Sequence, residues 1–393
     1  MSRNKERGAM SPQLVRTVAF YLAFVTVGMA TASFGPGIPS FARNTGETLA
    51  RVGVLFVFHR IGYISGSLGV GRLFDRSSGT LLTGMALLLI SIGLLLLPLA
   101  RSVELLWGFI LLVGLAQGST EVGANTGVVK LWGAHAGPAM NGLHLSYGVG
   151  AIVAPLVLLV SIGRFDSVRY GYWVLAGLTF AAAICVLMVP EQRAAAAKKE
   201  AQLSGSSVAL VALLTLVLFA TIAGEASIGG WIYSYSVASG IGSPRYAGYL
   251  NSGFWAALTL GRLVGIDLVR RLGVRTLILS NTLGAVIAMT LFLLVPANPV
   301  VVAAAVVLLG LAQASIAPAV FTFAGQLNVL SGRVAGLFVA GASSGAMTLP
   351  WLVGHFFDTA GPISFVWLVW GSQLVALAAF CAVMFAARRK RSA

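Results

Sequence analysis

Long apolar runs, separated by short charged or Gly/Pro-rich stretches, dominate the chain. Each of the twelve runs approaches or exceeds the roughly 20 residues that an α-helix needs to cross the hydrocarbon core of a bilayer. The predicted helices cover residues 14–40, 50–73, 80–99, 102–130, 137–161, 168–189, 208–236, 244–268, 275–295, 299–328, 332–356 and 362–387. This pattern predicts an all-α polytopic membrane protein with 12 transmembrane helices.

Composition supports this class and excludes soluble ones. The 393 residues are 58% apolar and 9% charged, whereas soluble domains carry about 25% charged residues. The two cysteines lie inside apolar runs and the four histidines have no metal-ligand spacing, so we expect no disulfide, no metal site, no cofactor and no enzyme activity. The first run exceeds the apolar core of a signal peptide, which favours a retained span over a cleaved signal.

The distribution of basic residues predicts how the helices are oriented. If the N-terminus is inside, inner segments carry eighteen Lys and Arg residues and outer loops carry six, while Arg60 and Arg262 lie within spans. This bias follows the positive-inside rule. We therefore expect a multi-pass protein of the cell (inner) membrane with both termini cytoplasmic. The net charge of +15 is spread over loops, so it does not indicate nucleic-acid binding.

The two halves of the sequence are repeats of one another. Residues 114–119 (Gly-Leu-Ala-Gln-Gly-Ser) recur as residues 310–315 (Gly-Leu-Ala-Gln-Ala-Ser), and similar shifts of about 195 relate other helices. We predict an N-terminal six-helix bundle (1–190), a cytoplasmic linker (191–207) and a C-terminal six-helix bundle (208–393). Parallel repeats of this kind place a binding site between the halves near the bilayer midplane.

The repeat and one loop together resemble a known family. Residues 71–79 (Gly-Arg-Leu-Phe-Asp-Arg-Ser-Ser-Gly) are similar to the loop between the second and third helices of the major facilitator superfamily, although the spacing before the last glycine differs. The resemblance implies that fold for the whole chain, and it implies a gating role for Asp75 and Arg76.

A narrower resemblance involves the fourth and fifth helices. Residues 121–126 (Glu-Val-Gly-Ala-Asn-Thr) and 141–144 (Asn-Gly-Leu-His) resemble segments of the branch that contains L-fucose:proton symporters and animal sodium-dependent glucose transporters. The resemblance implies monosaccharide uptake coupled to H⁺ or Na⁺. This sequence lacks the helix-1 acid of the fucose symporter.

Four charged residues lie in the interiors of the predicted spans, away from their ends: Glu121, Glu225, Arg60 and Arg262. A charge at the bilayer centre costs roughly 3 kcal/mol or more, so each needs a partner or an aqueous cavity. We predict that Glu121 takes the coupling ion, with Glu225 as a second candidate. Either arginine could be the partner of Glu121. The alternative is that these charges form static ion pairs that fix helix packing.

Helical spacing groups the candidate substrate-binding residues. Gln117, Glu121 and Asn125 share one helix face, and a polar stripe of this kind should face inward. Asn251 and Trp255 share a face with Arg262, and an aromatic ring beside donors and acceptors suits a sugar. The remaining candidates are Asn141, His144, Trp231 and Gln313.

Glycine and proline content predicts breaks in the first helix of each half. Residues 34–37 (Phe-Gly-Pro-Gly) and 229–230 (Gly-Gly) should interrupt these helices near their outer ends. The alternative is that the glycines only allow close helix contact.

Together these features predict a monomeric secondary transporter that alternates access to a midplane site. We expect its partners to be the lipid bilayer and a small-molecule substrate, a sugar according to the family resemblance. The alternatives are a proton-coupled exporter of amphipathic compounds or lipids, and a membrane sensor that binds solute without moving it.

Overall fold

The computed structural model describes residues 12–74, 79–189 and 208–392, and all regular structure in these ranges is helical. Twelve segments are long and apolar enough to span a bilayer. The first six spans comprise α1 (Pro12–Thr45), α2 (Leu49–Gly53) with α3 (Leu55–Phe74), α4 (Gly79–Leu96), α5 (Val103–Trp132), α6 (Ala136–Phe165) and α7 (Arg169–Leu187). The last six comprise α8 (Val208–Ala238), α9 (Pro244–Leu272), α10 (Val274–Leu294), α11 (Pro299–Gln313) with α12 (Ile316–Gln326), α13 (Gly332–Thr359) and α14 (Ile363–Ser392).

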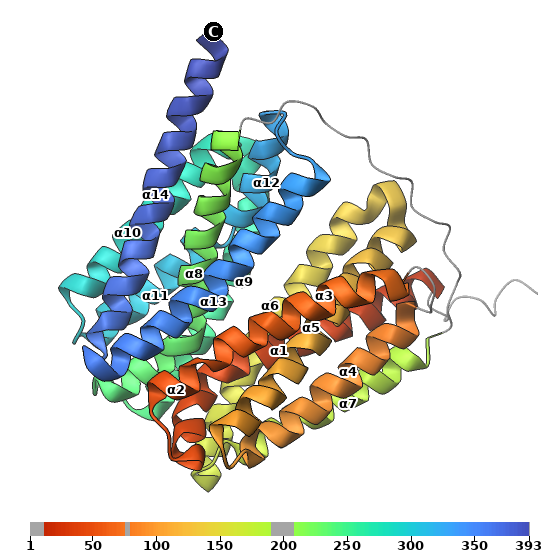
Figure 1. Ribbon diagram of the computed structural model, residues 1–393, viewed down its shortest axis with the longest axis vertical. Coiled ribbons are helices and arrows are strands. Elements are labelled where there is room, and N and C mark those ends of the chain that lie inside the picture. Colours follow the sequence, from red (N-terminus) through yellow and green to blue (C-terminus); the bar gives the residue numbers. More distant parts are fainter. Residues whose placement is uncertain (1–11, 75–78, 190–207, 393) are drawn as a thin grey trace, which may run out of the picture.

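These helices form two bundles that lean against each other. The bundles meet at the end that holds α2 and diverge toward the end where α14 terminates (Figure 1). Between them, α1 packs against α8, α6 packs against α9, and α2 and α3 pack against α13. We call the end at which α1 begins and α14 terminates the termini side, and the opposite end the far side. The predicted fold class is confirmed, whereas the predicted linker (191–207) lies outside the described residues.

Two predicted helices are divided in the structure. The helix expected at 50–73 is split at Val54 into α2 and α3, and the helix expected at 299–328 is split at Ala314 and Ser315 into α11 and α12. Both splits lie where another helix packs closely. Gly53 of α2 lies against Trp231 and Gly354, and Ser315 occupies the space beside Gly265, where its hydroxyl donates to the Gly261 carbonyl.

The predicted breaks in the first helix of each half are wrong. Pro36 and Pro39 lie inside the continuous helix α1, and Gly229 and Gly230 lie inside the continuous helix α8. Proline removes helical hydrogen bonds, but neighbouring helices can compensate in a membrane protein. In α1 the Tyr172 hydroxyl of α7 donates to the Ser33 carbonyl at 2.9 Å, which supports the proline-containing turn from outside.

Glycines allow the closest helix contact in the first bundle. A Cβ at Gly62 or Gly66 of α3 would collide with the backbone of α5, and a Cβ at Gly114 or Gly118 of α5 would collide with the backbone of α3. The two helices therefore cross backbone to backbone, as small residues permit within a bilayer. This crossing fixes the register of α3, which carries His59 and Arg60, relative to α5.

Candidate functional site

A cavity lies where the two bundles meet. It contains about 500 Å³ of empty space, part of which is open to solvent. Both halves contribute to its walls, with Thr31, Phe34, Phe56, His59, Arg60 and Tyr147 from the first and Ile222, Glu225, Ala226, Gly229, Gly230, Trp255 and Ala346 from the second. The wall therefore combines aromatic rings with an acid, a base and a hydroxyl, which is the mixture that a polar organic solute needs.

Two charged residues, Arg60 and Glu225, line the cavity from different helices, and Arg262 lies beside it. Glu225 of α8 forms an ion pair with Arg262 of α9, with 3.8 Å between Oε1 and Nη2, and the Glu225 side chain is 15% exposed. Arg60 of α3 lies over the Tyr63 ring, 5.3 Å from its centroid. Among the described residues Arg60 has no ion pair, so its charge is available to the cavity.

Glu121 is placed differently from the sequence-based expectation. The Tyr63 hydroxyl is the group that interacts most strongly with its carboxylate. Neither Arg60 nor Arg262 forms an ion pair with it in the described part of the chain, although both lie close enough to act on it electrostatically. The closest acid–base pair of the core is thus Glu225 with Arg262, which the sequence had not singled out.

Gln117 is buried inside the first bundle and does not line the cavity. Its amide nitrogen donates to the Val27 carbonyl at 3.0 Å and to the Thr31 hydroxyl at 3.1 Å. Its amide oxygen lies 2.5 Å from His59 Nε2 and accepts from it, because the nitrogen side of the amide is already used. Gln117 therefore holds in place two residues that do line the cavity, Thr31 and His59.

Gln313 occupies the corresponding place in the second bundle. It is buried, and its amide nitrogen donates to the Thr221 carbonyl of α8 and to Gln373 Oε1 of α14. Like Gln117, it lies behind the first helix of its half rather than in the cavity.

Two other predicted substrate contacts lie in the closed region on the far side. The Asn251 amide is fully buried and donates to the Gly229 carbonyl at 2.8 Å, close to Gly35 of α1. Trp231 is also fully buried, and its Nε1 donates to the Pro350 carbonyl at 2.9 Å. The Trp231 indole nitrogen is thus used within the protein, whereas Asn251 Oδ1 is buried without a hydrogen-bond partner among the described residues.

Of the remaining candidates, which are Asn125 of α5, Asn141 and His144 of α6 and Trp255 of α9, only Trp255 lines the cavity. Trp255 is 4% exposed and meets Tyr147 of the other half edge to face, with 6.2 Å between ring centroids. Asn125 donates to the Glu121 carbonyl of its own helix, whereas Asn141 and His144 are exposed. The structure therefore brings together Trp255, Glu225 and Arg60, and leaves the other candidates outside the cavity wall.

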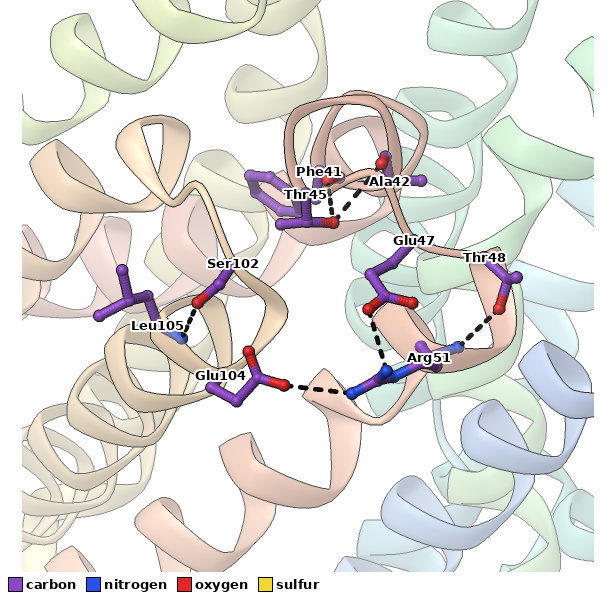
Figure 2. A network of polar contacts seen from close by, with 9 residues as sticks. All are labelled: Phe41, Ala42, Thr45, Glu47, Thr48, Arg51, Ser102, Glu104 and Leu105. Atoms are coloured by element: carbon purple, nitrogen blue, oxygen red, sulfur yellow. Dashed lines mark hydrogen bonds and ion pairs between the residues drawn. The ribbon is translucent and has the colours of Figure 1, made fainter.

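The far side is closed by polar and packing contacts. Arg51 forms ion pairs with Glu47 at 2.9 Å and with Glu104 of α5 at 3.1 Å, which ties α2 to the first bundle (Figure 2). From the second bundle, Asp358 Oδ2 accepts from the Ala50 amide of α2 at 2.7 Å. The cavity is therefore shut off from the far side by contacts that cross between the halves.

Comparison with known proteins assigns the family. The model of the Major Facilitator Superfamily matches residues 20–350, which is most of the chain. The chain belongs to the major facilitator superfamily. Like its relatives and structural neighbours, it is a multi-pass membrane transporter of small molecules. It is not an enzyme.

Among its relatives are two sodium-dependent glucose transporters. The chain is 26% identical to sodium-dependent glucose transporter 1A of Mus musculus over 373 residues, covering 85% of this chain and 88% of the mouse protein. It is 25% identical to sodium-dependent glucose transporter 1 of Homo sapiens over 371 residues, covering 84% of this chain and 71% of the human protein.

Solved structures share the fold at low identity. The nucleoside transporter NupG superposes with a TM-score of 0.74 at 16% identity, covering 95% of this chain and 99% of NupG. A bacterial homologue of the lysosomal transporter Spinster, in an inward-facing and unoccupied conformation, superposes with a TM-score of 0.72 at 12% identity, covering 97% and 96% of the two chains.

Sequence reasoning missed part of the cavity wall of this major facilitator protein. Phe34, Phe56 and Ala346 carry no chemical signal in the sequence, and only the packing of α1, α3 and α13 brings them together. Thr31 could have been found from Gln117, because both lie on polar faces of neighbouring helices. The predicted gating residues Asp75 and Arg76 lie outside the described residues.

Proposed function

We propose that this transporter is an ion-coupled symporter that takes up a monosaccharide or a similar small polar solute by alternating access. The observation that carries the proposal is the cavity between the bundles, where the Glu225–Arg262 pair and Arg60 lie beside Trp255 and Tyr147. An aromatic ring can stack on the C–H face of a sugar while charged groups bond its hydroxyls. The similarity to sodium-dependent glucose transporters supports the same cargo class.

The coupling ion is H⁺ or Na⁺, and Glu121 and Glu225 are the residues that respond to it. Both carboxylates lie in the core of the protein, where an unpaired charge is unfavourable and binding of a cation or a proton is correspondingly favoured. Glu225 lines the cavity directly, whereas Glu121 acts from the neighbouring helix α5 beside Tyr63. Arg60 lies close enough to both to act on their charge.

The termini side faces the cytoplasm, and the described conformation is inward-facing. Eighteen basic residues on the inner segments against six on the outer loops support this orientation through the positive-inside rule. The contacts of Asp358 with the Ala50 amide of α2 and of the Trp231 ring with the Phe56 ring of α3 then close the extracellular side. Uptake requires these contacts to break in the outward-facing state and the bundles to meet on the cytoplasmic side instead.

Uptake into proteoliposomes tests this function. The purified protein is reconstituted, and accumulation of labelled monosaccharides is measured with an imposed inward Na⁺ gradient, an inward H⁺ gradient, or neither. We expect accumulation above the external concentration for at least one sugar with one of the two gradients. Binding without flux would instead identify a sensor, and gradient-driven extrusion of amphipathic compounds without sugar uptake would identify an exporter.

A further inference from the structure

Each half of the protein contains an equivalent hydrogen bond from a buried glutamine to a neighbouring helix. Gln117 and Gln313 are related by the repeat, and each donates its amide to a carbonyl of the first helix in its half. The acceptors, Val27 and Thr221, are also related by nearly the same shift. The bond is therefore a conserved element of the internal repeat, and differences around it show what is special to each half.

The amide oxygens of the two glutamines have different surroundings. Gln117 Oε1 accepts from His59. Gln313 Oε1 is buried and has no hydrogen-bond partner among the described residues. The residue that the repeat places opposite His59 is Phe254, which is fully buried and cannot donate. The second half thus keeps the acceptor and lacks its donor, which is unfavourable in a buried site.

A second unpaired oxygen belongs to Thr221, the residue whose carbonyl accepts from Gln313. Thr221 Oγ1 is buried and also has no partner in the described part of the chain, although the Thr221 carbonyl lies 3.4 Å from Gln313 Nε2. Its counterpart in the first half, Val27, carries no hydroxyl. The relative exposures of Thr221 and Gln313 are 0% and 2%. The second half therefore adds an unpartnered hydroxyl on the residue that Gln313 contacts.

The helix that carries Gln313 ends at this residue. α11 stops at Gln313, and Ala314 and Ser315 separate it from α12, whereas the repeat-related helix α5 is continuous to Trp132. The last carbonyls of a helix lack partners within the helix, and they form the negative end of its dipole. Ends of broken helices in transporters coordinate Na⁺ in this way.

We propose that Thr221 Oγ1, Gln313 Oε1 and the carbonyl end of α11 bind a sodium ion. All the groups are neutral oxygen ligands, which suit a hard monovalent cation, and no cluster of His, Cys, Asp and Glu able to hold another metal is found among the described residues. The proposal rests on ion-coupled transport, for which it names the ion. Thr221 lies one helical turn before Glu225, so an ion at this site is linked through α8 to the cavity wall.

Direct binding of Na⁺ to the purified full-length protein tests the site without any sugar. Binding of ²²Na⁺ and the Na⁺-dependent shift in Tm are measured in nanodiscs, with choline chloride maintaining the ionic strength. We expect saturable binding by the unmodified protein. Thr221→Val, which preserves the side-chain shape, and Gln313→Leu should each weaken Na⁺ binding at least tenfold.

Thr282→Val is the matched control, because the buried Thr282 hydroxyl of the same half donates to carbonyls of its own helix. It should leave Na⁺ binding unchanged. The proposal is overturned if the unmodified protein binds no Na⁺, in which case water satisfies the two oxygens, or if Thr221→Val binds Na⁺ as tightly as the unmodified protein. Proton-driven sugar uptake without Na⁺ binding would leave the proposed symport intact and remove only this site.

Discussion

Asp358 and Ala50 join the two halves of the transporter across its far side. The carboxylate of Asp358, near the end of α13, accepts a hydrogen bond of 2.7 Å from the backbone amide of Ala50 in α2. Arg51, the next residue, holds α2 to Glu104 of the first bundle. Because α2 is tied to the first bundle, opening of the far side must break the bond between Asp358 and Ala50.

Loss of this bond should favour the state that is open on the far side. A solvent-exposed hydrogen bond contributes about 1 kcal/mol, which corresponds to roughly a fivefold change in the equilibrium between the two states. In a background with Cys185→Ala and Cys381→Ala, the cavity residue Ala346 is replaced by cysteine, and its labelling by an impermeant thiol reagent added from the far side is measured. Asp358→Ala should increase the labelling rate severalfold.

Asp166→Asn is the control for this prediction. Asp166 is also an exposed acid on the far side, but it bonds to no residue of the second half in the described structure. In the Asp166→Asn variant, the cysteine that replaces Ala346 should be labelled at the same rate as in the protein with Asp166 intact. Equal rates for the parent and Asp358→Ala would show that this bond does not hold the far side closed.

Packing of Gly354 against α2 supplies a second part of the closure. A Cβ at Gly354 would lie 2.9 Å from the Trp231 ring, whose indole nitrogen is fixed to Pro350, and 3.4 Å from Gly53 of the other half. Gly354→Val should therefore prevent the far side from closing and slow transport by at least tenfold. Gly371→Val, at a position with open space around it, should preserve transport. Normal transport by Gly354→Val would contradict this account of the closure.

Gln117 should stabilise the first bundle rather than contact cargo. Gln117→Leu removes the partner of the buried His59 and two bonds to α1, so we expect a loss of about 1–3 kcal/mol in the free energy of unfolding. A lower Tm, together with a moderate rise in the KM for sugar through the displaced Thr31, is the expected result. Asn125→Ala should preserve Tm, since Asn125 bonds only within its own helix. A rise in KM with no change in Tm would instead indicate that Gln117 binds cargo directly.

The Glu225–Arg262 pair provides a double-mutant test of coupling. The two side chains are partly exposed, so their pairing should contribute little to the free energy of unfolding. We expect its main effect to be on transport. Glu225→Gln and Arg262→Gln should each reduce gradient-driven uptake, and the double variant should lose less than the product of the two single effects. Strictly multiplicative losses would show that the two residues act independently in transport.

The sequence was sufficient to predict the fold because its signals are long and repetitive. Twelve apolar runs of membrane-spanning length, and a repeat such as residues 114–119 with 310–315, determine two six-helix bundles. The splits at Val54 and at Ala314 were missed, because the nearby Gly53 and Pro318 give no stronger local signal than Pro36 does, and the approach of other helices decides the outcome. Pro36 and its flanking glycines misled the prediction in the opposite direction, since tertiary contacts keep α1 continuous.

The candidate site was predicted less completely, for a physical reason. Helical spacing shows that Gln117, Glu121 and Asn125 lie on one face, but it does not show how far that face is from the axis between the bundles. Gln117 therefore lies one layer behind the cavity, whereas Trp255 reaches it. The pairing of Arg262 with Glu225 depends on how α8 and α9 cross, which a single sequence does not specify.

The role of Glu121 can be separated from that of Glu225 by comparing two modes of transport. Gln at either position removes the charge and preserves the shape, so exchange of labelled for unlabelled sugar should persist while accumulation fails. Asp166→Asn, at an exposed acid outside the closure contacts, should retain both modes. If Glu121→Gln still accumulates sugar and Glu225→Gln does not, Glu121 is a structural partner of Tyr63 and Glu225 carries the coupling.

Ion-coupled sugar uptake is tested most directly by the steady-state accumulation ratio of a labelled monosaccharide in proteoliposomes. The ratio is measured with an imposed Na⁺ or H⁺ gradient for the unmodified protein and for the double variant Glu121→Gln with Glu225→Gln. The account predicts a ratio well above one for the unmodified protein and a ratio of one for the double variant, with exchange preserved in both. A ratio of one for the unmodified protein under both gradients, or undiminished accumulation by the double variant, would contradict it.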